Sequence, residues 1–480
     1  MKLSKLLNGV EFNGNPEDCE IQSIIHDSRK VKSGSLFVAI KGFETDGHDY
    51  ILDAVNKGAV AILSNGRSLD NLPVPVVKVK NPRACMSQIS ANFYGHPSRD
   101  LNVIGITGTN GKTSITQLLY SLYNKNGKPA GTLGTLGFST PTGMSTTGFT
   151  TPESVEVQQL LNMMKIGGVE NAIMEISSHA LELNRVDDVE VNIAIFTNLT
   201  QDHLDFHGTI ENYFKAKLKL FKGLSNNSIA IVNIDNPFGQ RIIEETDCKS
   251  ITYGINPKAN LCAIEYQLSL DETYIKLKWQ DHVFEVKSNL IGLYNLENLL
   301  AVIATALISG ISIENIKSGI NSDLTIPGRM EKIRINENQN AIVDYAHTPD
   351  AFEQILSTVQ NLSNNSTQII TVFGCGGDRD KDKRPQMAKI AESFSDFVFV
   401  TSDNPRNENV EDICNDIKNG FSGNDFKIIY NREDVIIEAM KFLNENSVLL
   451  VLGKGRDDYE QIGNEKFPHS DIGIIKSQIK

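Results

Sequence analysis

A glycine-rich loop that joins an apolar run to a helical stretch constrains the fold more than any other feature of the sequence. The β-branched run Leu101–Thr107 leads into Gly108-Thr109-Asn110-Gly111-Lys112-Thr113, and Ser114 opens a segment with helical spacing. A strand–loop–helix unit of this kind presents backbone N–H groups and a helix N-terminus to a phosphate. We therefore predict a P-loop nucleotide site, with Lys112 at the terminal phosphates and the Thr113 hydroxyl on Mg²⁺.

The loop departs from the common phosphate-loop pattern at one position. That pattern has a glycine five residues before Gly111, where this chain has Ile106. A glycine turn followed by a chance Gly-Lys-Thr is the alternative interpretation, but the strand before the loop and the helix after it argue against a chance match. The sequence therefore predicts a variant of the phosphate loop.

Apolar runs alternate with helical segments from Leu101 onward, and two junctions divide the chain. A chain of 480 residues is too long for one hydrophobic core. The segments 94–98 and 326–329 have the glycine and proline content of linkers. Strands that alternate with helices indicate parallel sheets. We predict an α/β protein with a small N-terminal α/β domain (1–98), a central P-loop parallel-sheet domain (99–326) and a C-terminal Rossmann-like α/β domain (327–480).

Polar residues accompany two further apolar runs of the central region. Ala172–Ser177 contains Glu175, and Val191–Asn198 is followed closely by His203. Ligands of open α/β sheets bind beyond the carboxyl ends of the strands, so we expect both side chains to lie near Thr113. Each one alone would more often be an ordinary core or loop residue. Together they offer the oxygen and nitrogen donors of a divalent metal site beside the nucleotide.

Composition argues against several classes of protein. Lys and Arg number 46 against 59 Asp and Glu, a net charge of −13 that disfavours a general nucleic-acid-binding protein. No apolar run approaches the roughly 20 residues that span a bilayer, and the N-terminus lacks a secretory-signal pattern. The six cysteines form no CxxC pair, which favours reduced thiols. We expect a cytoplasmic, monomeric enzyme without nucleic-acid partners or membrane insertion.

Motifs spread over the whole chain resemble those of the Mur ligases of peptidoglycan synthesis. They include Glu175-Ile176-Ser177-Ser178-His179, Tyr294-Asn295-Leu296-Glu297-Asn298, Asp344-Tyr345-Ala346-His347 and Gly374–Pro385. The phosphate loop alone marks a wider superfamily that includes folylpolyglutamate synthase. Residues 374–380 (Gly-Cys-Gly-Gly-Asp-Arg-Asp) and 403–406 (Asp-Asn-Pro-Arg) resemble the MurE-like members, which add the third residue of the stem peptide.

The resemblance implies an ATP-dependent acid–amino-acid ligase that forms ADP and phosphate. It would add meso-diaminopimelate to the D-glutamate carboxylate of UDP-N-acetylmuramoyl-L-alanyl-D-glutamate through an acyl phosphate, with Mg²⁺ as cofactor. The catalytic residues would be Lys112, Glu175, His203 and Lys217. Lys217 would carry a carbamate and join Thr113, Glu175 and His203 as a metal ligand; without the resemblance, Lys217 would be taken for a solvated helix lysine.

The remaining site residues are likewise implied by the resemblance. ATP would contact Gly108, Thr109, Asn110, Gly111, Lys112, Thr113 and Ser114, the adenine-facing pair Asn295 and Asn298, and Arg329 and Asp344. The UDP-linked dipeptide would contact Ser28, Phe43, Glu44, Thr45, Thr150, Thr151, Ser177 and Arg185. Diaminopimelate would contact Arg379, Asp403, Asn404, Pro405, Arg406, Gly453 and Asp457.

Substrate choice is expected to depend on the two arginines of the C-terminal domain. Arg379 and Arg406 each follow a predicted strand, and two guanidinium groups suit a substrate with two carboxylates.

Two residues depart from the pattern of some family members. Leu183 replaces a glutamine that precedes the sugar-binding arginine, and Asp457 is a shorter carboxylate than the glutamate found there.

Three alternative functions remain open at this level. A ligase of the same type that adds L-lysine is the nearest one. A folylpolyglutamate synthase-like ligase would lack the uridine-binding domain that residues 1–98 are expected to form. A P-loop NTPase without ligase activity is the third, and its GTPase form would show an Asn-Lys-x-Asp motif. In this chain, however, Asn198 is followed by Leu199.

Overall fold

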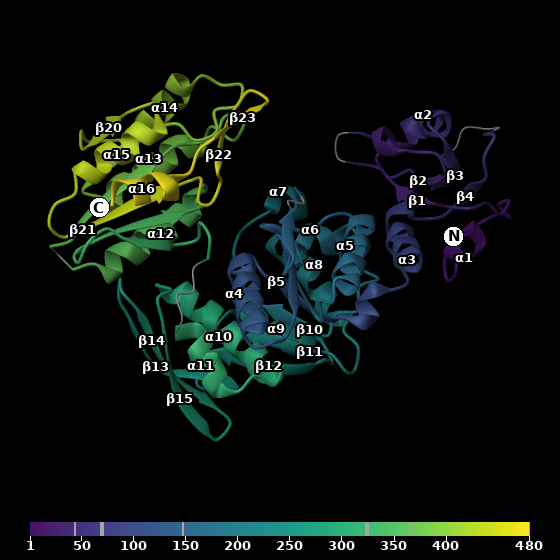
Figure 1. The fold of residues 1–480 in the computed structure, drawn as a ribbon, viewed down its shortest axis with the longest axis horizontal. Helices are drawn as coiled ribbons and strands as arrows, with labels where there is room; N and C mark the ends of the chain where they lie inside the picture. Colours follow the sequence, from purple (N-terminus) through teal and green to yellow (C-terminus); the bar gives the residue numbers. More distant parts are fainter. Residues whose placement is uncertain (43–44, 68–71, 146–147, 322–325, 365, 480) are drawn as a thin grey trace. The chain divides into compact units, whose positions relative to one another are not determined.

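The computed structural model describes residues 1–480 apart from 43–44, 68–71, 146–147, 322–325, 365 and 480 (Figure 1). The predicted α/β class with parallel sheets is confirmed. Among the described residues, none of the helices has the length and apolarity needed to cross a membrane. The chain divides into two compact units. The first unit comprises Met1–Ile264, Leu277–Phe284 and Glu297–Gly319. The second unit comprises Glu265–Lys276, Glu285–Leu296 and Ile320–Lys480.

The N-terminal region is built on a parallel sheet of four strands, coloured purple in Figure 1. In spatial order they are β1 (Ser23–Ile25), β2 (Ser35–Val38), β3 (Ala59–Ser64) and β4 (Val76–Lys78). Its helices are α1 (Leu3–Leu6), α2 (Ile51–Asn56) and α3 (Pro82–Tyr94), with 3₁₀ helices η1 (Ser28–Lys30), η2 (Gly47–Tyr50) and η3 (Pro97–Asp100). The Asn81 side chain caps the start of α3, and Gly95 ends it in the left-handed conformation that favours glycine.

The central sheet has 11 strands in the order β15-β14-β13-β12-β11-β10-β5-β9-β6-β7-β8. The run from β12 to β6 is parallel, and β7 and β8 continue it in antiparallel fashion. The strands are β5 (Asn102–Thr107), β6 (Ala130–Gly134), β7 (Gly137–Thr140), β8 (Gly143–Ser145), β9 (Asn171–Glu175), β10 (Ile193–Phe196), β11 (Ile229–Asn233), β12 (Lys249–Gly254), β13 (Leu261–Leu268), β14 (Thr273–Trp279) and β15 (His282–Ser288).

Helices cover this sheet and bury its apolar side chains. They are α4 (Lys112–Lys125), α5 (Ser154–Ile166), α6 (Ser178–Glu182), α7 (Leu204–His207), α8 (Ile210–Lys222), α9 (Pro237–Glu245), α10 (Leu293–Ile308) and α11 (Ile313–Asn321). On one face, Met174 and Phe196 from the strands pack with Leu161 of α5 and Phe221 of α8 in a single core. Burial on both faces explains why these strands are continuous apolar runs in the sequence.

The C-terminal sheet is also parallel, except that β16 is antiparallel to β17. In spatial order its strands are β16 (Glu331–Arg334), β17 (Gln339–Asp344), β21 (Ser447–Leu452), β18 (Gln368–Phe373), β19 (Phe397–Val400) and β20 (Phe426–Ile428). The helices are α12 (Pro349–Leu362), α13 (Lys383–Phe394), α14 (Val410–Lys418), α15 (Arg432–Lys441) and α16 (Asp471–Gln478), and β22 (Tyr459–Ile462) pairs with β23 (Glu465–Pro468).

Successive residues of β17 alternate between two cores of this sheet. Ile342 packs in the core that contains Phe352 of α12, whereas Ala341 and Val343 pack in the core that contains Val435 of α15. This alternation follows from the two-residue period of a strand, and it places helices on both faces of the sheet. The C-terminal domain therefore has the doubly wound architecture predicted for it.

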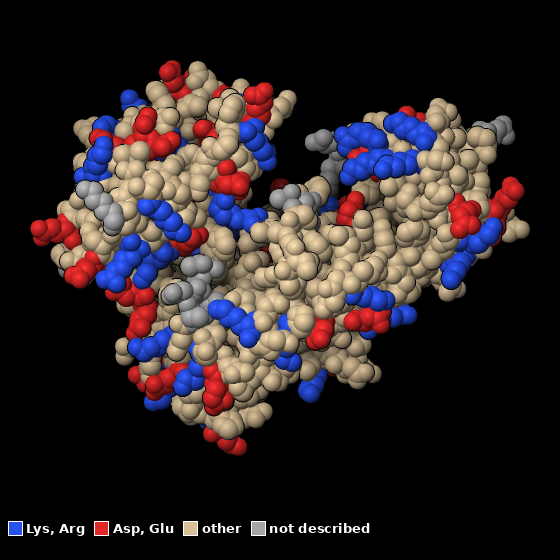
Figure 2. Space-filling view, in the orientation of Figure 1, with Lys and Arg blue, Asp and Glu red and all other residues tan. Residues whose placement is uncertain are grey.

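Charged side chains of both signs are interspersed on the surface. On the face shown in Figure 2, Lys and Arg side chains lie among Asp and Glu side chains over each part of the molecule.

Candidate functional site

The phosphate loop follows β5 and leads directly into α4, as predicted. Gly108 (φ +154) and Gly111 (φ +89) take backbone conformations that disfavour residues with a side chain. A β-carbon at Gly108 would lie 1.8 Å from Thr197 Oγ1, and one at Gly111 would lie 2.3 Å from Asn298 Oδ1. Ile106, where the common pattern has glycine, is buried within β5. This loop therefore begins later than the common one, at Gly108.

Gly108→Ala is expected to abolish ATP binding, because the added methyl group cannot fit beside Thr197. The matched control is Gly127→Ala, just beyond the other end of α4. There the backbone is also left-handed (φ +66), but nothing lies within 4 Å of an added β-carbon. The control should cost about 1 kcal/mol of stability and keep its ATP affinity. Calorimetric titration with ATP measures both variants, and equal affinities would contradict the prediction.

Two lysine side chains converge on the carbonyl oxygen of Gly108. Lys112 Nζ donates to it at 2.8 Å and to the Thr109 carbonyl at 2.8 Å. Lys217 Nζ, from α8, donates to the Gly108 carbonyl at 2.9 Å. Lys217 is only 1% exposed, and burial, with the charge of Lys112, lowers its pKa well below the ordinary value. Lys217 is therefore no solvated helix lysine, and its neutral amine, the form that reacts with CO₂, is favoured.

Tyr213 covers Lys217 from one helical turn away. Lys217 Nζ lies 4.5 Å from the centroid of the Tyr213 ring, and the Tyr213 hydroxyl is 3.1 Å from Thr109 Oγ1. Burial raises the pKa of Tyr213 to about 12, so the phenol stays neutral. Tyr213 was not among the residues predicted for the site. The four-residue spacing between Tyr213 and Lys217 could have indicated this contact, because it places both side chains on one face of α8.

Glu175 ends β9 and lies against the start of α4. It is 1% exposed, and its Oε2 accepts a hydrogen bond from the Thr113 hydroxyl at 3.0 Å. Thr135, which the sequence analysis missed, donates its N–H to Oε1 at 2.9 Å and its hydroxyl to Oε2 at 3.0 Å. Thr135 follows β6, so the rule that ligands gather beyond strand ends could have found it. The predicted pair of Thr113 and Glu175 is thus in direct contact.

His203 lies at the start of α7 and is partly exposed. Its ring centroid is 4.9 Å from that of His179, and its Nε2 is 3.4 Å from Asp202 Oδ2. Burial, partly offset by Asp202, lowers the pKa of His203. The neutral imidazole that can ligate a metal is therefore favoured near neutral pH.

The predicted metal ligands fit Mg²⁺ in their donor chemistry. Thr113 and Glu175 supply hard oxygen atoms at one point of the sheet edge, and a carbamate on Lys217 would add another. In the part of the chain that the structure describes, no three His, Cys, Asp or Glu side chains gather to hold a metal. The predicted set contains only two residues of those types. It therefore depends on the Thr113 hydroxyl and on the modification of Lys217.

The residues predicted for the dipeptide surround Glu175. The Thr151 hydroxyl donates to the Glu175 carbonyl at 2.8 Å and accepts from the Ser177 N–H at 3.1 Å. Thr150 Oγ1 is 3.0 Å from Thr135 Oγ1. Arg185 donates to the Thr151 carbonyl at 2.9 Å. The structure thus brings these four residues together beside the phosphate loop.

Glu153 joins the dipeptide residues to the N-terminal region, and the sequence analysis missed it. Its Oε1 accepts from Arg185 Nη2 at 2.8 Å and from Arg83 Nη1, on α3, at 2.6 Å. Arg83 Nη2 also donates to the carbonyl of Lys41 at 3.2 Å. The contact links residues far apart in sequence, which no local pattern predicts.

The predicted uridine residues lie in the N-terminal region. Ser28 is buried at the start of η1, and its carbonyl accepts from Lys57 Nζ at 3.2 Å. Thr45 is exposed, and its carbonyl accepts from the N–H of Gly42 at 2.8 Å. Phe43 and Glu44 lie outside the described residues.

The predicted adenine and hinge residues are buried or half-buried. Asn295 and Asn298 lie on one face of α10, and Asn295 Nδ2 donates to the Ile291 carbonyl at 2.9 Å. Asp344 ends β17 and accepts from the N–H groups of Met330 and Ala346, both at 2.7 Å. Burial raises the pKa of Asp344, and Arg329 opposes that shift. The Arg329 guanidinium lies 5.0 Å from the centre of the Tyr345 ring.

The two arginines predicted for diaminopimelate meet at Gly376. A β-carbon there would lie 2.9 Å from Arg406 Nη1 and 3.8 Å from Arg379 Cγ. Arg379 is exposed, whereas Arg406 is half-buried and donates from Nη1 to the Gly377 carbonyl at 2.7 Å. Arg406 also has a left-handed backbone (φ +50), and its N–H donates to the Gln461 carbonyl at 3.0 Å.

A buried polar cluster supports the Asp403–Arg406 segment. Asn404 Oδ1 accepts from Lys454 Nζ at 3.0 Å and from the Gln461 N–H at 2.8 Å. Pro405 is buried beside Gly377. A β-carbon at Gly453 (φ +113) would lie 2.5 Å from Asp403 Oδ2. Burial, followed by the charge of Asp403, raises the pKa of Asp457.

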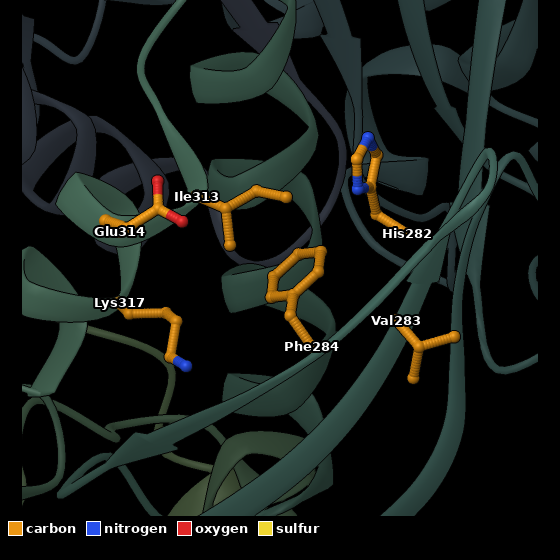
Figure 3. Close-up of a pocket in the computed structure, with 6 residues that line it drawn as sticks. All are labelled: His282, Val283, Phe284, Ile313, Glu314 and Lys317. Atoms are coloured by element: carbon orange, nitrogen blue, oxygen red, sulfur yellow. The ribbon is translucent and has the colours of Figure 1, made fainter.

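One pocket lies on other elements of the first unit. Figure 3 shows this pocket of about 380 Å³ between β15 and α11, with Phe284 directed toward Ile313. Its lining residues are His282, Val283, Phe284, Ile313, Glu314 and Lys317. None of the predicted site residues lines it.

Comparisons with known proteins match the whole chain. Residues 20–94 match the model of the Mur ligase family catalytic domain, 106–306 the Mur ligase middle domain, and 328–455 the Mur ligase glutamate ligase domain. UDP-N-acetylmuramoyl-L-alanyl-D-glutamate–2,6-diaminopimelate ligase 1 of Clostridium acetobutylicum is 40% identical over 100% of this chain and 99% of its own. The ligase of the same name from Halalkalibacterium halodurans is also 40% identical, over the same shares. A solved structure of such a ligase is 30% identical, with a TM-score of 0.70 over 96% of this chain and 94% of its own.

Proposed function

Because the chain belongs to the Mur ligase family, we propose that it adds meso-diaminopimelate to the D-glutamate carboxylate of UDP-N-acetylmuramoyl-L-alanyl-D-glutamate. The relatives named above are ligases of 2,6-diaminopimelate. The observation that carries the proposal is the convergence of Lys112 and Lys217 on the Gly108 carbonyl, beside the Thr113–Glu175 pair. This arrangement suits phosphoryl transfer from ATP to a carboxylate.

The chemistry requires an acyl phosphate, because a carboxylate has no good leaving group for attack by an amine. Lys112 and the N–H groups of the phosphate loop bind the terminal phosphates of ATP. Thr113, Glu175, His203 and a carbamate on Lys217 would hold Mg²⁺, which when bound neutralises charge on the transferring phosphoryl group. Thr151, Ser177 and Arg185 hold the acceptor with its carboxylate in line with the γ-phosphate. The amine then attacks the acyl carbon, and phosphate leaves.

Arg406 supplies the preference for diaminopimelate over L-lysine in this proposal. Its guanidinium binds the distal carboxylate, which lysine lacks. A lysine substrate would instead bring an ammonium toward a cation. We expect kcat/KM to favour meso-diaminopimelate by roughly 10⁴-fold, measured with each amino acid in the same assay. Comparable values for the two amino acids would contradict this preference.

Two features of the chain weigh against the other candidates. Residues 20–94 match a Mur ligase family model, as expected of the uridine-binding domain that a folylpolyglutamate synthase would lack. The chain is also similar to diaminopimelate ligases over its full length, which disfavours an NTPase without ligase activity. The same proposal includes three domains with limits at 98 and 326, a monomeric state, and a cytoplasmic location where ATP is available.

The proposed function is tested by phosphate release from ATP. Release should require both UDP-N-acetylmuramoyl-L-alanyl-D-glutamate and meso-diaminopimelate, and omission of either should return the rate to background. Release that is independent of the amino acid would instead indicate an ATPase. Release with a folate acceptor would indicate the folylpolyglutamate synthase-like alternative.

A further inference from the structure

Arg384, at the start of α13, is one of the largest fully buried side chains of the described residues, with 0% exposure. Its Nη2 donates to Glu408 Oε1 at 2.9 Å and to the Gly376 carbonyl at 3.3 Å. Its Nη1 donates to Glu408 Oε2 at 3.1 Å and to Asp416 Oδ2 at 2.8 Å. Burial of a guanidinium costs free energy unless carboxylates and carbonyls pair with it. Here Glu408, Asp416 and the Gly376 carbonyl pair with Arg384.

Glu408 also forms contacts with the segment that follows Gly377. Its Oε1 accepts from the N–H of Asp378 at 2.6 Å, and its Oε2 lies 3.0 Å from Lys381 Nζ. Asn407, the neighbour of Glu408, donates from Nδ2 to Asp378 Oδ2 at 2.7 Å. Glu408 and Asn407 follow Arg406 directly in the chain. The network therefore ties the loop at 374–380 to the segment at 403–408.

The peptide group that receives Arg406 is fixed from both sides. Arg406 Nη1 donates to the Gly377 carbonyl at 2.7 Å. The preceding carbonyl, of Gly376, accepts from Arg384, and the following N–H, of Asp378, donates to Glu408. A β-carbon at Gly377 would lie 1.9 Å from the Pro405 carbonyl oxygen, so the two segments are in tight contact. Movement of either segment would displace the Arg406 guanidinium.

We propose that Arg384 and Glu408 are positioning residues that hold the Arg406 guanidinium for the distal carboxylate of the amino-acid substrate. This inference rests on the proposed function and deepens it. The pair acts only through Arg406, because Arg384 is buried and its hydrogen bonds go to Glu408, Asp416 and Gly376. Loss of the pair should weaken binding of the amino acid specifically. Binding of ATP and of the UDP-linked dipeptide should be unchanged.

Glu408→Gln in the full-length enzyme is the central test. It should raise KM for meso-diaminopimelate about tenfold, as expected for a lost charge-assisted hydrogen bond. The KM values for ATP and the dipeptide should stay at the parent values, and the preference over L-lysine should fall by the same factor. The matched control is Asp416→Asn, which removes the other carboxylate partner of Arg384 but touches neither loop. The control should keep the parent KM for meso-diaminopimelate.

A second variant covers the case in which Glu408→Gln does not fold. Asn407→Ala removes an exposed side chain and only its hydrogen bond to Asp378. It should also raise KM for meso-diaminopimelate, by a smaller factor, without lowering the melting temperature.

The outcomes separate this inference from the proposed function. If the parent enzyme does not use meso-diaminopimelate, the proposed function fails and the inference fails with it. If the parent is active and Glu408→Gln or Asn407→Ala leaves KM and the lysine preference unchanged, only the inference is overturned. A KM increase that Asp416→Asn reproduces would also overturn it, because the pair would then be merely structural.

Discussion

Lys112→Ala is expected to abolish turnover while the protein keeps its fold. In the proposed mechanism, Lys112 provides positive charge where the terminal phosphates of ATP lie and where charge shifts in the transition state. Cationic groups in this role contribute about 10³–10⁵ to the rate of other phosphoryl-transfer enzymes. The Gly108 carbonyl retains its hydrogen bond from Lys217, so the loop keeps one of its two lysine contacts. Phosphate release in the presence of all three substrates measures the effect.

The matched control for Lys112→Ala is Lys125→Ala, at the other end of α4. Lys125 is exposed and lies away from the phosphate loop, so its removal should leave turnover at the parent value. The prediction for Lys112 is wrong if the variant retains activity within about tenfold of the parent, a loss near 1.4 kcal/mol. Such a result would also exclude this loop as the catalytic nucleotide site.

Lys217→Ala should be nearly inactive, with a loss of more than about 10³-fold, or 4 kcal/mol, and small carboxylates should partly restore it. Burial favours the neutral amine of Lys217, and carbamylation turns that amine into an anionic oxygen ligand. Formate or acetate can occupy the space that the shortened side chain leaves. Turnover measured across a series of formate and acetate concentrations tests the rescue.

Lys215→Ala is the matched control on the same helix. Lys215 is exposed on α8, so its removal should change neither the activity nor the response to formate. Rescue that is equal in Lys112→Ala and Lys217→Ala would argue against the carbamate. A free Lys217 amine in the crystal structure of an active, substrate-bound enzyme would contradict it directly.

The apolar runs at 101–107, 172–177 and 191–198 predicted strands β5, β9 and β10 of the central sheet, whereas β6–β8 and β11–β15 were not predicted. The run at 101–107 is β5 shortened by one residue, and the run at 172–177 is β9 displaced by one to two residues. These strands are buried on both faces, so each appears as an unbroken apolar run. The phosphate loop was recognisable for a similar reason, because its residues are consecutive and its conformation requires glycine at Gly108 and Gly111.

Contacts between distant segments could not be predicted in this way. Arg384 lies in the sequence Asp-Lys-Arg-Pro, which is typical of a solvated surface, yet it is fully buried. Its burial depends on Glu408 and Asp416, which lie beside it because β18 pairs with β19 and α13 packs against α14. Tyr213 and Thr135 were missed because each acts through a neighbour and not through a motif of its own.

The contacts of Glu153 also limit how this enzyme can be recombined. One carboxylate oxygen of Glu153 pairs with both Arg83 of the N-terminal region and Arg185 of the predicted dipeptide site. A chimera that exchanges residues 1–98 for those of another ligase must therefore supply an arginine at position 83. Without it, Glu153 would pair with Arg185 alone, and the position of Arg185, which is proposed to hold the acceptor, would no longer be tied to the N-terminal region. Because the carboxylate of Glu153 pairs with arginines of both the N-terminal region and the central region, the two regions cannot be engineered as independent modules.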